Sequence, residues 1–146
     1  MTVLKIIPDI VSDQTICAMP ETAIAADAAR RMIDFDVGAI VVVDDTGKLT
    51  GIVTERDIAR RVVAAQLDPE KTSVGQIMSR NPDTLAPGDS PFNALELMWI
   101  RHLRHLPVVE NDRVVGMVSI RDLCEAMKLM LEESVSETEA SLFDDL

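Results

Sequence analysis

The chain has 146 residues, with 14 Lys or Arg against 25 Asp or Glu, and its formal net charge is −11. With 47% hydrophobic and 27% charged residues, it has the composition of a soluble globular protein of one or two small domains. The acidic excess argues against broad electrostatic binding to nucleic acid or anionic membranes, because both require a basic surface. No apolar run is long enough to span a bilayer, and no secretory signal is visible, so we expect a cytoplasmic protein.

The sequence repeats itself at an offset of 65 or 66 residues. Residues 51–57 (GIVTERD) match residues 116–122 (GMVSIRD), and further identities lie upstream in the same order. These upstream matches are Val42-Val43 with Val108-Val109, Ala28 with Ala94, and Met32 with Met98. The one extra residue of the first copy falls between the valine pair and the glycine, where a turn is expected. We therefore interpret the chain as two copies of one unit.

Each copy is predicted to form a strand, a helix, two strands and a second helix, which makes the fold class α+β. Helical spacing links Ala25, Ala28, Ala29, Met32 and Ile33, and the same stripe recurs at Pro91, Ala94, Leu95, Met98 and Trp99. Residues 39–43 and 49–53 are predicted as a hairpin around the turn 44–47 (DDTG), and residues 106–109 and 114–118 as its counterpart. The second helices are predicted to begin at Thr54 and Ser119.

The domain boundaries follow from the repeat. We assign residues 10–66 to copy one, 67–76 to a linker with a short capped turn, 77–131 to copy two and 132–146 to an acidic tail. A single copy of this size buries too little surface to be stable alone, so we expect the copies to pack with pseudo-twofold symmetry around two equivalent clefts. The tail has six acidic and no basic residues, which predicts a solvated helical extension or a frayed end. Alternatively, Leu142, Phe143 and Leu146 dock on a partner subunit.

The repeated pattern Gly-h-h-[Thr/Ser]-x-Arg-Asp, where h is apolar, is the best candidate for chemistry. The hydroxyl and carboxylate residues have the spacing of a helix cap and its partner, so the pattern could be structural capping alone. A helix N-terminus also offers free N–H groups to a phosphate, the arginine adds a bidentate cation, and the carboxylate can accept hydrogen bonds from ribose hydroxyls. The candidate ribose-phosphate residues are Thr54, Arg56 and Asp57 in copy one and Ser119, Arg121 and Asp122 in copy two.

In these motifs the chain resembles a tandem of cystathionine β-synthase (CBS) domains, the arrangement called a Bateman module. The signature lies at residues 38–43 (GAIVVV) and 51–57 in copy one, and at 104–109 (RHLPVV) and 116–122 in copy two. The resemblance covers about residues 10–130. It implies a βαββα fold for each copy and two clefts that bind adenine-containing ligands such as AMP, ADP, ATP, NAD(H) or S-adenosylmethionine.

The resemblance also implies the contacts of such a ligand. Asp57 or Asp122 would hold the ribose, and the hydroxyl and arginine neighbours of each would meet the phosphate. Adenine would lie against the second strand and the residue that opens each copy. Those positions are Gly38, Ala39, Ile40, Val41 and about Cys17 in copy one, and Arg104, His105, Leu106, Pro107 and about Thr84 in copy two. Because Cys17 or a neighbour replaces the hydroxyl of Thr84, the second cleft is favoured.

The remaining candidates are weaker. His102 and His105 lack further ligands at suitable spacing, so we predict no metal site; His105 with Arg104 could instead face phosphate or an interface, or end a solvated helix. The basic stripe Arg56, Arg60 and Arg61 is typical of a solvated face paired with nearby acids, and Asp57 is close; given the overall negative charge, we do not expect nucleic-acid binding. No Ser-His-Asp or Cys-His grouping has sequence support for catalysis.

These observations predict a non-catalytic regulatory module that senses an adenine nucleotide and has no catalytic cofactor. The alternative is a docking subunit of an enzyme or transporter, in which the nucleotide is structural or absent. An enzyme such as a nucleotide hydrolase is a third, weaker interpretation. The resemblance further implies a homodimer through the second helix of each copy, and we expect Ile58, Val62, Leu123 and Met127 at its interface.

Overall fold

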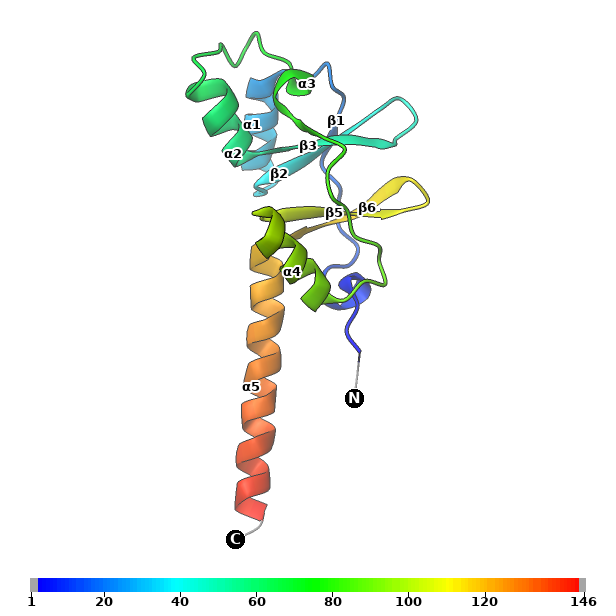
Figure 1. Ribbon diagram of the computed structural model, residues 1–146, viewed down its shortest axis with the longest axis vertical. Helices are drawn as coiled ribbons and strands as arrows, with labels where there is room; N and C mark the ends of the chain where they lie inside the picture. The colour runs from blue at the N-terminus through cyan, green and yellow to red at the C-terminus, as the bar shows by residue number, and fades with distance from the viewer. Residues whose placement is uncertain (1–2, 145–146) are drawn as a thin grey trace.

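The computed structural model describes residues 3–144. The two copies are stacked along the long axis of the molecule, with the sheet of copy one above the hairpin of copy two (Figure 1). The two hairpin turns lie on the same side, where residues Lys48 and Arg113 form an isolated antiparallel bridge between the copies. The α+β architecture with two repeats predicted from the sequence is confirmed.

The sheet of copy one has four strands in the order β1-β2-β3-β4. Strand β1 (Ala18–Met19) is parallel to β2 (Ala39–Val43), which is antiparallel to β3 (Leu49–Thr54). Strand β4 (Ser79–Arg80) follows the linker, at the start of copy two, and pairs with the outer edge of β3. The central strand β2 is buried over most of its length, as its continuous apolar sequence predicts.

Copy two contains the hairpin of β5 (His105–Glu110) and β6 (Arg113–Ser119). Leu85 pairs in parallel with Val108 and takes the place that β1 has in copy one. The outer edge of β6 is covered by one side chain instead of a strand. The Gln14 amide donates to the Met117 carbonyl at 3.0 Å and accepts from the Met117 N–H at 2.9 Å.

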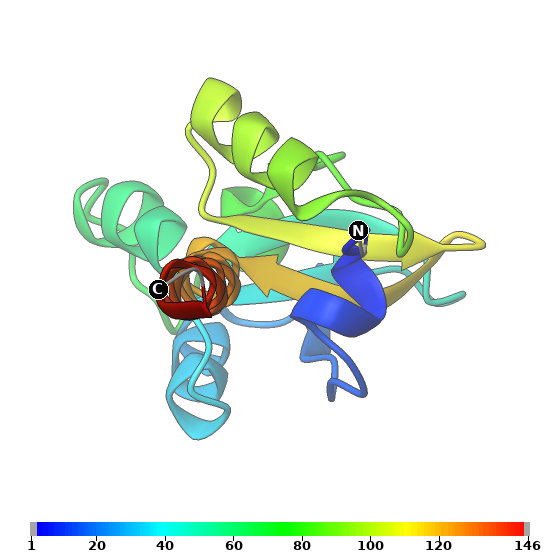
Figure 2. The same ribbon diagram turned by 90° about the horizontal axis from the view of Figure 1, so that it is seen from below.

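The helices bury only part of the predicted apolar stripes, because Ile33 and Trp99 are 80% and 83% exposed. Helix α1 (Ala25–Asp34) buries Ala25, Ala28 and Met32, and α4 (Pro91–Arg101) buries Pro91, Ala94 and Met98. The second helix of copy one begins as α2 (Glu55–Asp57) and continues as the wider turns of η2 (Ile58–Val63). Seen from below, the helices pack around the two sheets, with α5 (Ile120–Asp144) between α1 and α2 in projection (Figure 2).

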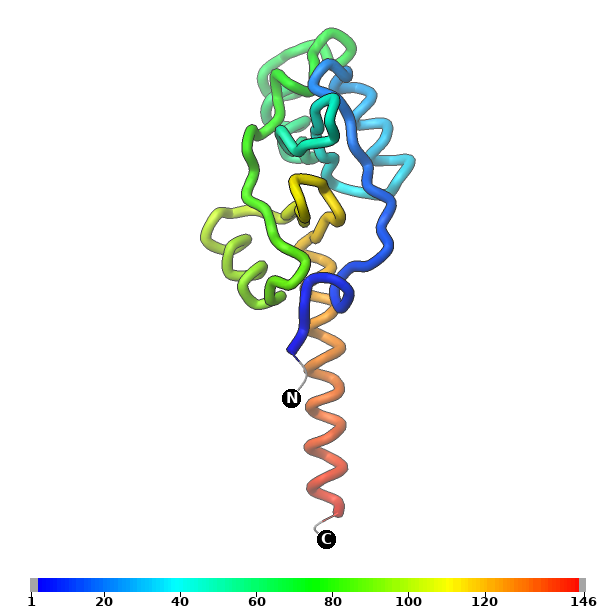
Figure 3. Tube along the Cα trace, turned by 90° about the vertical axis from the view of Figure 1, so that its right-hand side faces the viewer, coloured from blue at the N-terminus to red at the C-terminus, as the bar shows by residue number. Residues whose placement is uncertain are grey.

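Each copy receives part of its core from the segment that precedes the other copy. The N-terminal turn η1 (Ile6–Ile10) packs in the core of copy two, where Ile6 N–H donates to the Asp89 carbonyl at 2.9 Å. Helix α3 (Val74–Ile77) packs in the core of copy one, where Val74 N–H donates to the Ala23 carbonyl at 2.7 Å. The two connecting segments run along opposite sides of the molecule (Figure 3).

Helix α5 continues past copy two into the acidic tail and projects from the body (Figure 1). We call residues 131–144 the stalk; all of them are exposed. The predicted tail residues Asp145 and Leu146 lie outside the described residues. Within residues 3–144 no helix has both the length and the apolar character that crossing a membrane requires.

The interface residues expected from the sequence are partly wrong. Val62 is 1% exposed and Leu123 is 0% exposed, because both fill the core of their own chain. Ile58 is also packed against the core of copy one. The apolar side chains that the second helices leave exposed include Val63, Leu129 and Leu131.

Candidate functional site

The junction between β3 and α2 forms a closed capping box. The Thr54 N–H donates to Asp57 Oδ2 at 2.9 Å, and the Asp57 N–H donates to Thr54 Oγ1 at 3.2 Å. The Thr54 hydroxyl also lies 3.1 Å from the same carboxylate oxygen. Asp57 is only 9% exposed. This carboxylate therefore satisfies the start of its own helix.

Arg61 occupies the other oxygen of the same carboxylate. Its Nε lies 3.7 Å from Asp57 Oδ1, one helical turn along the chain. Its Nη1 donates to the carbonyls of Ile77 at 2.9 Å and Met78 at 3.0 Å, at the end of α3. Asp57 and Arg61 thus fasten α3 to the second helix of copy one, and in this structure they act as a structural pair.

The junction between β6 and α5 has the same cap without that partner. The Ser119 N–H donates to Asp122 Oδ2 at 2.9 Å, and the Asp122 N–H donates to Ser119 Oγ at 3.1 Å. At the offset of 65 residues, Ala126 stands where copy one has Arg61. Asp122 is half-buried and has no ion pair among residues 3–144. One oxygen of its carboxylate is therefore available to accept hydrogen bonds from a ligand.

The first residues of β2 and β5 bring the two copies together beside these junctions. Ala39 is opposite Thr54 in the ladder, and His105 is opposite Ser119. The His105 ring lies so close to Gly38 that a Cβ there would be 3.2 Å from Cε1 and Nε2. Burial lowers the pKa of His105 below its ordinary value, although the charges of Glu55 and Asp122 oppose this shift.

The other predicted wall residues are buried. Ile40 and Leu106 belong to the cores of copy one and copy two. Val41 and Pro107, the next residue in each strand, are buried as well. A ligand at these strands would therefore meet mainly backbone and the side chains at the strand starts. In copy two those are Arg104 and His105, and in copy one they are a glycine and an alanine.

The strand pairing corrects the counterpart of Thr84 in copy one. Met19 pairs with Val42, and Leu85 pairs with Val108, which is the same position one repeat later. The residue before Leu85 is Thr84, so its counterpart is Ala18 and not Cys17. Cys17 is half-buried against the core of copy one. The opening of copy one therefore has neither a hydroxyl nor a thiol at this position.

The predicted phosphate-binding arginines do not lie equivalently. Arg56 of copy one reaches copy two, where its Nη1 donates to the His102 carbonyl at 3.4 Å. Arg121 is exposed at the first turn of α5. Arg104 is also exposed, and with Arg56 it borders a groove between the second helix of copy one and helices α4 and α5. The structure thus brings Arg56 together with Arg104, across the two copies.

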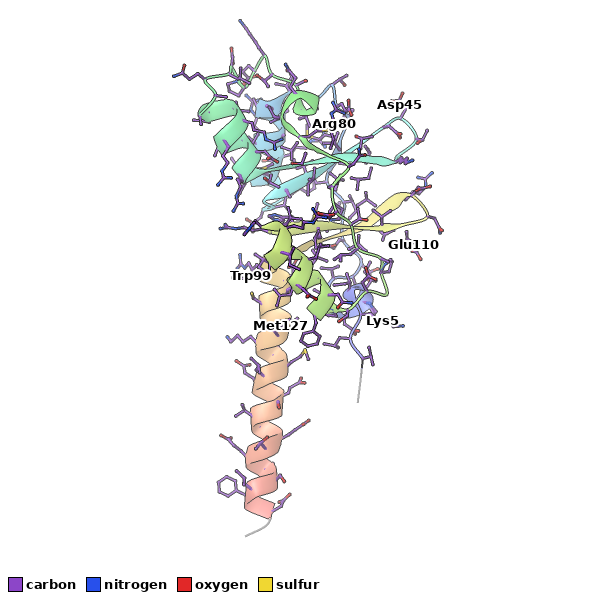
Figure 4. The ribbon with its side chains drawn as sticks, viewed as in Figure 1. Lys5, Asp45, Arg80, Trp99, Glu110 and Met127 are labelled. Carbon is purple, nitrogen blue, oxygen red and sulfur yellow. The ribbon has the colours of Figure 1, made fainter. Side chains whose placement is uncertain are left out.

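This groove has a volume of about 1080 Å³, and we call it the arginine groove. Three arginines and one acidic residue contribute its charges, and aromatic and aliphatic side chains form the rest of its lining. Trp99, the only tryptophan of the chain, is 83% exposed there and projects outward from α4 (Figure 4). The charged lining residues of the groove are Arg56, Arg60, Arg104 and Glu96, and its aromatic lining residues are Phe92 and Trp99.

Sequence reasoning noted that Asp57 is close to the basic stripe, but it missed the hydrogen bonds from Arg61 to the end of α3 and it missed the groove. The Asp57–Arg61 spacing of four residues on a predicted helix was a usable signal, because side chains at that spacing meet. The groove had no such signal, since its walls come from both copies. Among residues 3–144 no group of three or more His, Cys, Asp or Glu side chains is arranged to hold a metal ion.

Comparison with known proteins identifies the class. The CBS domain family matches residues 7–64 and 74–129, which together make up most of the chain. The chain therefore belongs to the CBS domain family, with two CBS domains in tandem. CBS-domain pairs are generally regulatory, and CBS domains commonly bind adenine nucleotides.

Individual relatives agree with this assignment. CBS domain-containing protein CBSCBSPB3 of Arabidopsis thaliana is 40% identical over 102 residues, which are 70% of this chain but 18% of that protein. The chain thus spans about a fifth of the length of such curated relatives. A CBS-domain structure from Burkholderia ambifaria is 30% identical with a TM-score of 0.79, covering 85% of this chain and 93% of its own. A hexameric CBS-CP12 protein from bloom-forming cyanobacteria is 25% identical with a TM-score of 0.74, covering 84% and 70%.

Proposed function

We propose that the chain is a regulatory module that binds an adenine nucleotide at the junction of copy two. One observation carries this proposal: the Asp122 carboxylate has an oxygen without an ion-pair partner among the described residues, at the N-terminus of a long helix. A carboxylate in that position suits ribose hydroxyls, and the adjoining N–H groups and arginines suit phosphate. The ligand would be AMP, ATP, NAD(H) or S-adenosylmethionine.

The surroundings of Asp122 support the second cleft over the first. Thr84 supplies a hydroxyl where copy one has Ala18, and Arg104 and His105 stand where copy one has Gly38 and Ala39. Ser119 and Arg121 would meet the phosphate together with Arg104. In copy one the corresponding carboxylate is engaged by Arg61, so we propose that Thr54, Arg56 and Asp57 bind nucleotide more weakly.

The regulatory step would be a change in how the two copies pack. The His105 ring lies beside Gly38 of the other copy, and His105 is opposite Ser119 in the β5–β6 ladder. A ligand that contacts β5 and the start of α5 would therefore also affect how His105 packs against the other copy. The ligand would shift the protein towards the packing arrangement that it binds more tightly. The size of the shift is set by the difference between its affinities for the two arrangements.

The experiment is a thermal melt with AMP, ATP, NADH and S-adenosylmethionine, followed by titration of the ligand that raises the melting temperature. We expect Asp122→Ala to weaken binding by at least tenfold and Asp57→Ala by much less. The ligand-free melts of both variants serve as the folding control. Nucleotide affinity that survives in the double variant would contradict the assignment.

We also propose that two copies of the chain associate through their second helices. The exposed apolar residues Val63, Leu129 and Leu131 on those helices support this arrangement. Sedimentation of the ligand-free protein tests it, and a monomer at micromolar concentration would contradict it. The regulated protein and the cytoplasmic location stay predictions. No melt shift with any nucleotide would favour the alternative of a docking subunit for an enzyme or transporter.

A further inference from the structure

The stalk has an apolar stripe flanked by acid. Leu131, Val135 and Leu142 follow the spacing of one helix face, and they are 67%, 56% and 65% exposed. Glu132 and Glu139 lie beside Leu131 and Val135 along a shallow groove of the helix surface. Five acidic residues and no basic residue occur in positions 132–144. This face is complementary to a surface that is both apolar and basic.

The arginine groove is a surface of that kind. Its apolar lining includes Phe92 and Trp99, which are 58% and 83% exposed, so a large aromatic surface is left in contact with water. Its charged lining consists of Arg56, Arg60 and Arg104 against Glu96 alone. Acidic and apolar features on the stalk thus have basic and apolar counterparts in the groove.

The stalk cannot reach the groove of its own chain. Ile120, the first residue of α5, lines the groove, and the same unbroken helix leads away from it. At a rise of about 1.5 Å per residue, Leu142 lies roughly 33 Å further along the axis. Only the stalk of another molecule can occupy the groove.

We infer that the stalk of one molecule docks in the arginine groove of a second copy, and that the second copy returns the same contact. A twofold axis across α5 would set the two α5 helices antiparallel and place each stalk beside the partner's groove. Parallel pairing would instead place two acidic stalks side by side, with like charges facing each other. The inference rests on the proposed association of two copies and does not depend on nucleotide binding.

Trp99 makes the inference measurable, because its fluorescence reports the groove alone. In the ligand-free 146-residue chain we expect Trp99 emission to be blue-shifted and protected from acrylamide at concentrations where sedimentation shows a dimer. Glu139→Lys should expose Trp99 and weaken dimerisation by roughly tenfold or more, because it brings a like charge to the arginines. Arg60→Glu should do the same, and the double variant should restore most of both signals.

Glu133→Lys is the matched control, because Glu133 is two residues from Leu131 and so lies about 200° round the helix. It makes the same charge change on the opposite face and should leave Trp99 protected. A dimer in which Glu139→Lys does not alter Trp99 would overturn the docking of the stalk and leave the association of two copies standing. A monomer would overturn both, whereas nucleotide binding is judged separately by the melt. No recovery in the double variant would overturn charge pairing as the basis of docking.

Discussion

The two strand-to-helix junctions share a sequence pattern, but their carboxylates have different neighbours. Asp57 accepts hydrogen bonds from its own helix cap, faces Arg61 at 3.7 Å and is 9% exposed. Asp122 makes the same cap, but Ala126 replaces the arginine. The repeated motif thus fastens the fold in one copy, whereas in the other the carboxylate has no ion-pair partner among residues 3–144. One residue outside the motif makes that distinction.

The largest expected effect comes from adding a methyl group at the covered outer edge of a strand. In copy one β4 covers β3, and in copy two the Gln14 side chain covers β6. A Cβ at Gly51 would lie 2.9 Å from the Ser79 carbonyl oxygen of β4, which cannot move without breaking the sheet. At Gly116 the nearest atom would be Gln14 Oε1 at 3.1 Å, at the end of a flexible side chain. We expect Gly51→Ala to lower the free energy of unfolding by about 1–3 kcal/mol and Gly116→Ala by under about 1 kcal/mol.

Urea denaturation of both variants measures these changes as a shift in midpoint at constant slope. The two substitutions are chemically identical, so each serves as the control for the other. Equal destabilisation would mean that the Gln14 side chain covers β6 as rigidly as β4 covers β3.

Removing Arg61 tests the structural role of the copy-one junction. Arg61→Ala deletes two hydrogen bonds to the end of α3 and leaves Asp57 without its cation. We expect a loss of about 1–2 kcal/mol in the free energy of unfolding, measured in the same way. Lys71→Ala, at an exposed basic residue of the linker, should change it by under about 0.5 kcal/mol. A similar loss in both variants would contradict the role given to Arg61.

Adding an arginine to copy two tests whether the missing cation is what distinguishes Asp122 from Asp57. Ala126→Arg places a cation one helical turn after Asp122, in the spacing of Asp57 and Arg61. If the free carboxylate binds ribose, nucleotide affinity should fall by roughly 3- to 10-fold, as measured by calorimetric titration. Ala126→Gln has a long side chain without the charge and should keep most of the affinity. Equal losses would point to crowding instead of ion pairing.

The smallest effect concerns His105. Because burial lowers its pKa in the folded state, the unfolded chain binds more protons in the window just below the ordinary histidine pKa. Stability should therefore rise with pH through that window and fall as pH decreases from about 7 towards 5. His105→Gln should flatten this part of the profile of melting temperature against pH. His102→Asn, at the exposed second histidine, should leave the slope unchanged.

Local patterns predicted much of the fold. Strand β2 is confirmed at residues 39–43, and the second helices begin directly after the predicted hydroxyls, Thr54 and Ser119. The hydrogen-bonded cap at each junction follows from its own four residues, which is why sequence alone could locate it. The equivalence of Ala18 and Thr84 depends on strand register, and a spacing difference of one residue hid it.

Other features depend on distant parts of the chain. Ile6 and Val74 are both fully buried, but neither local sequence indicates that it packs with the more distant copy. The arginine groove likewise needs Arg56 of copy one beside Arg104 of copy two. Only tertiary packing brings these residues together. Sequence reasoning therefore located the candidate residues within each copy, but it did not predict the contacts between the two copies.

Helix η1 packs in the core of copy two, and α3 packs in the core of copy one. The unit that repeats in the sequence is therefore not the unit that has a complete core. Cutting the chain in the linker near Asp68 would leave copy one without Val74 and Ile77, and copy two without Ile6 and Val11. Neither fragment would hold a complete core. The two fragments mixed together should reassemble, whereas each alone should stay largely unstructured. We therefore expect the two repeats to unfold in one cooperative step, so that a ligand binding either copy would stabilise both.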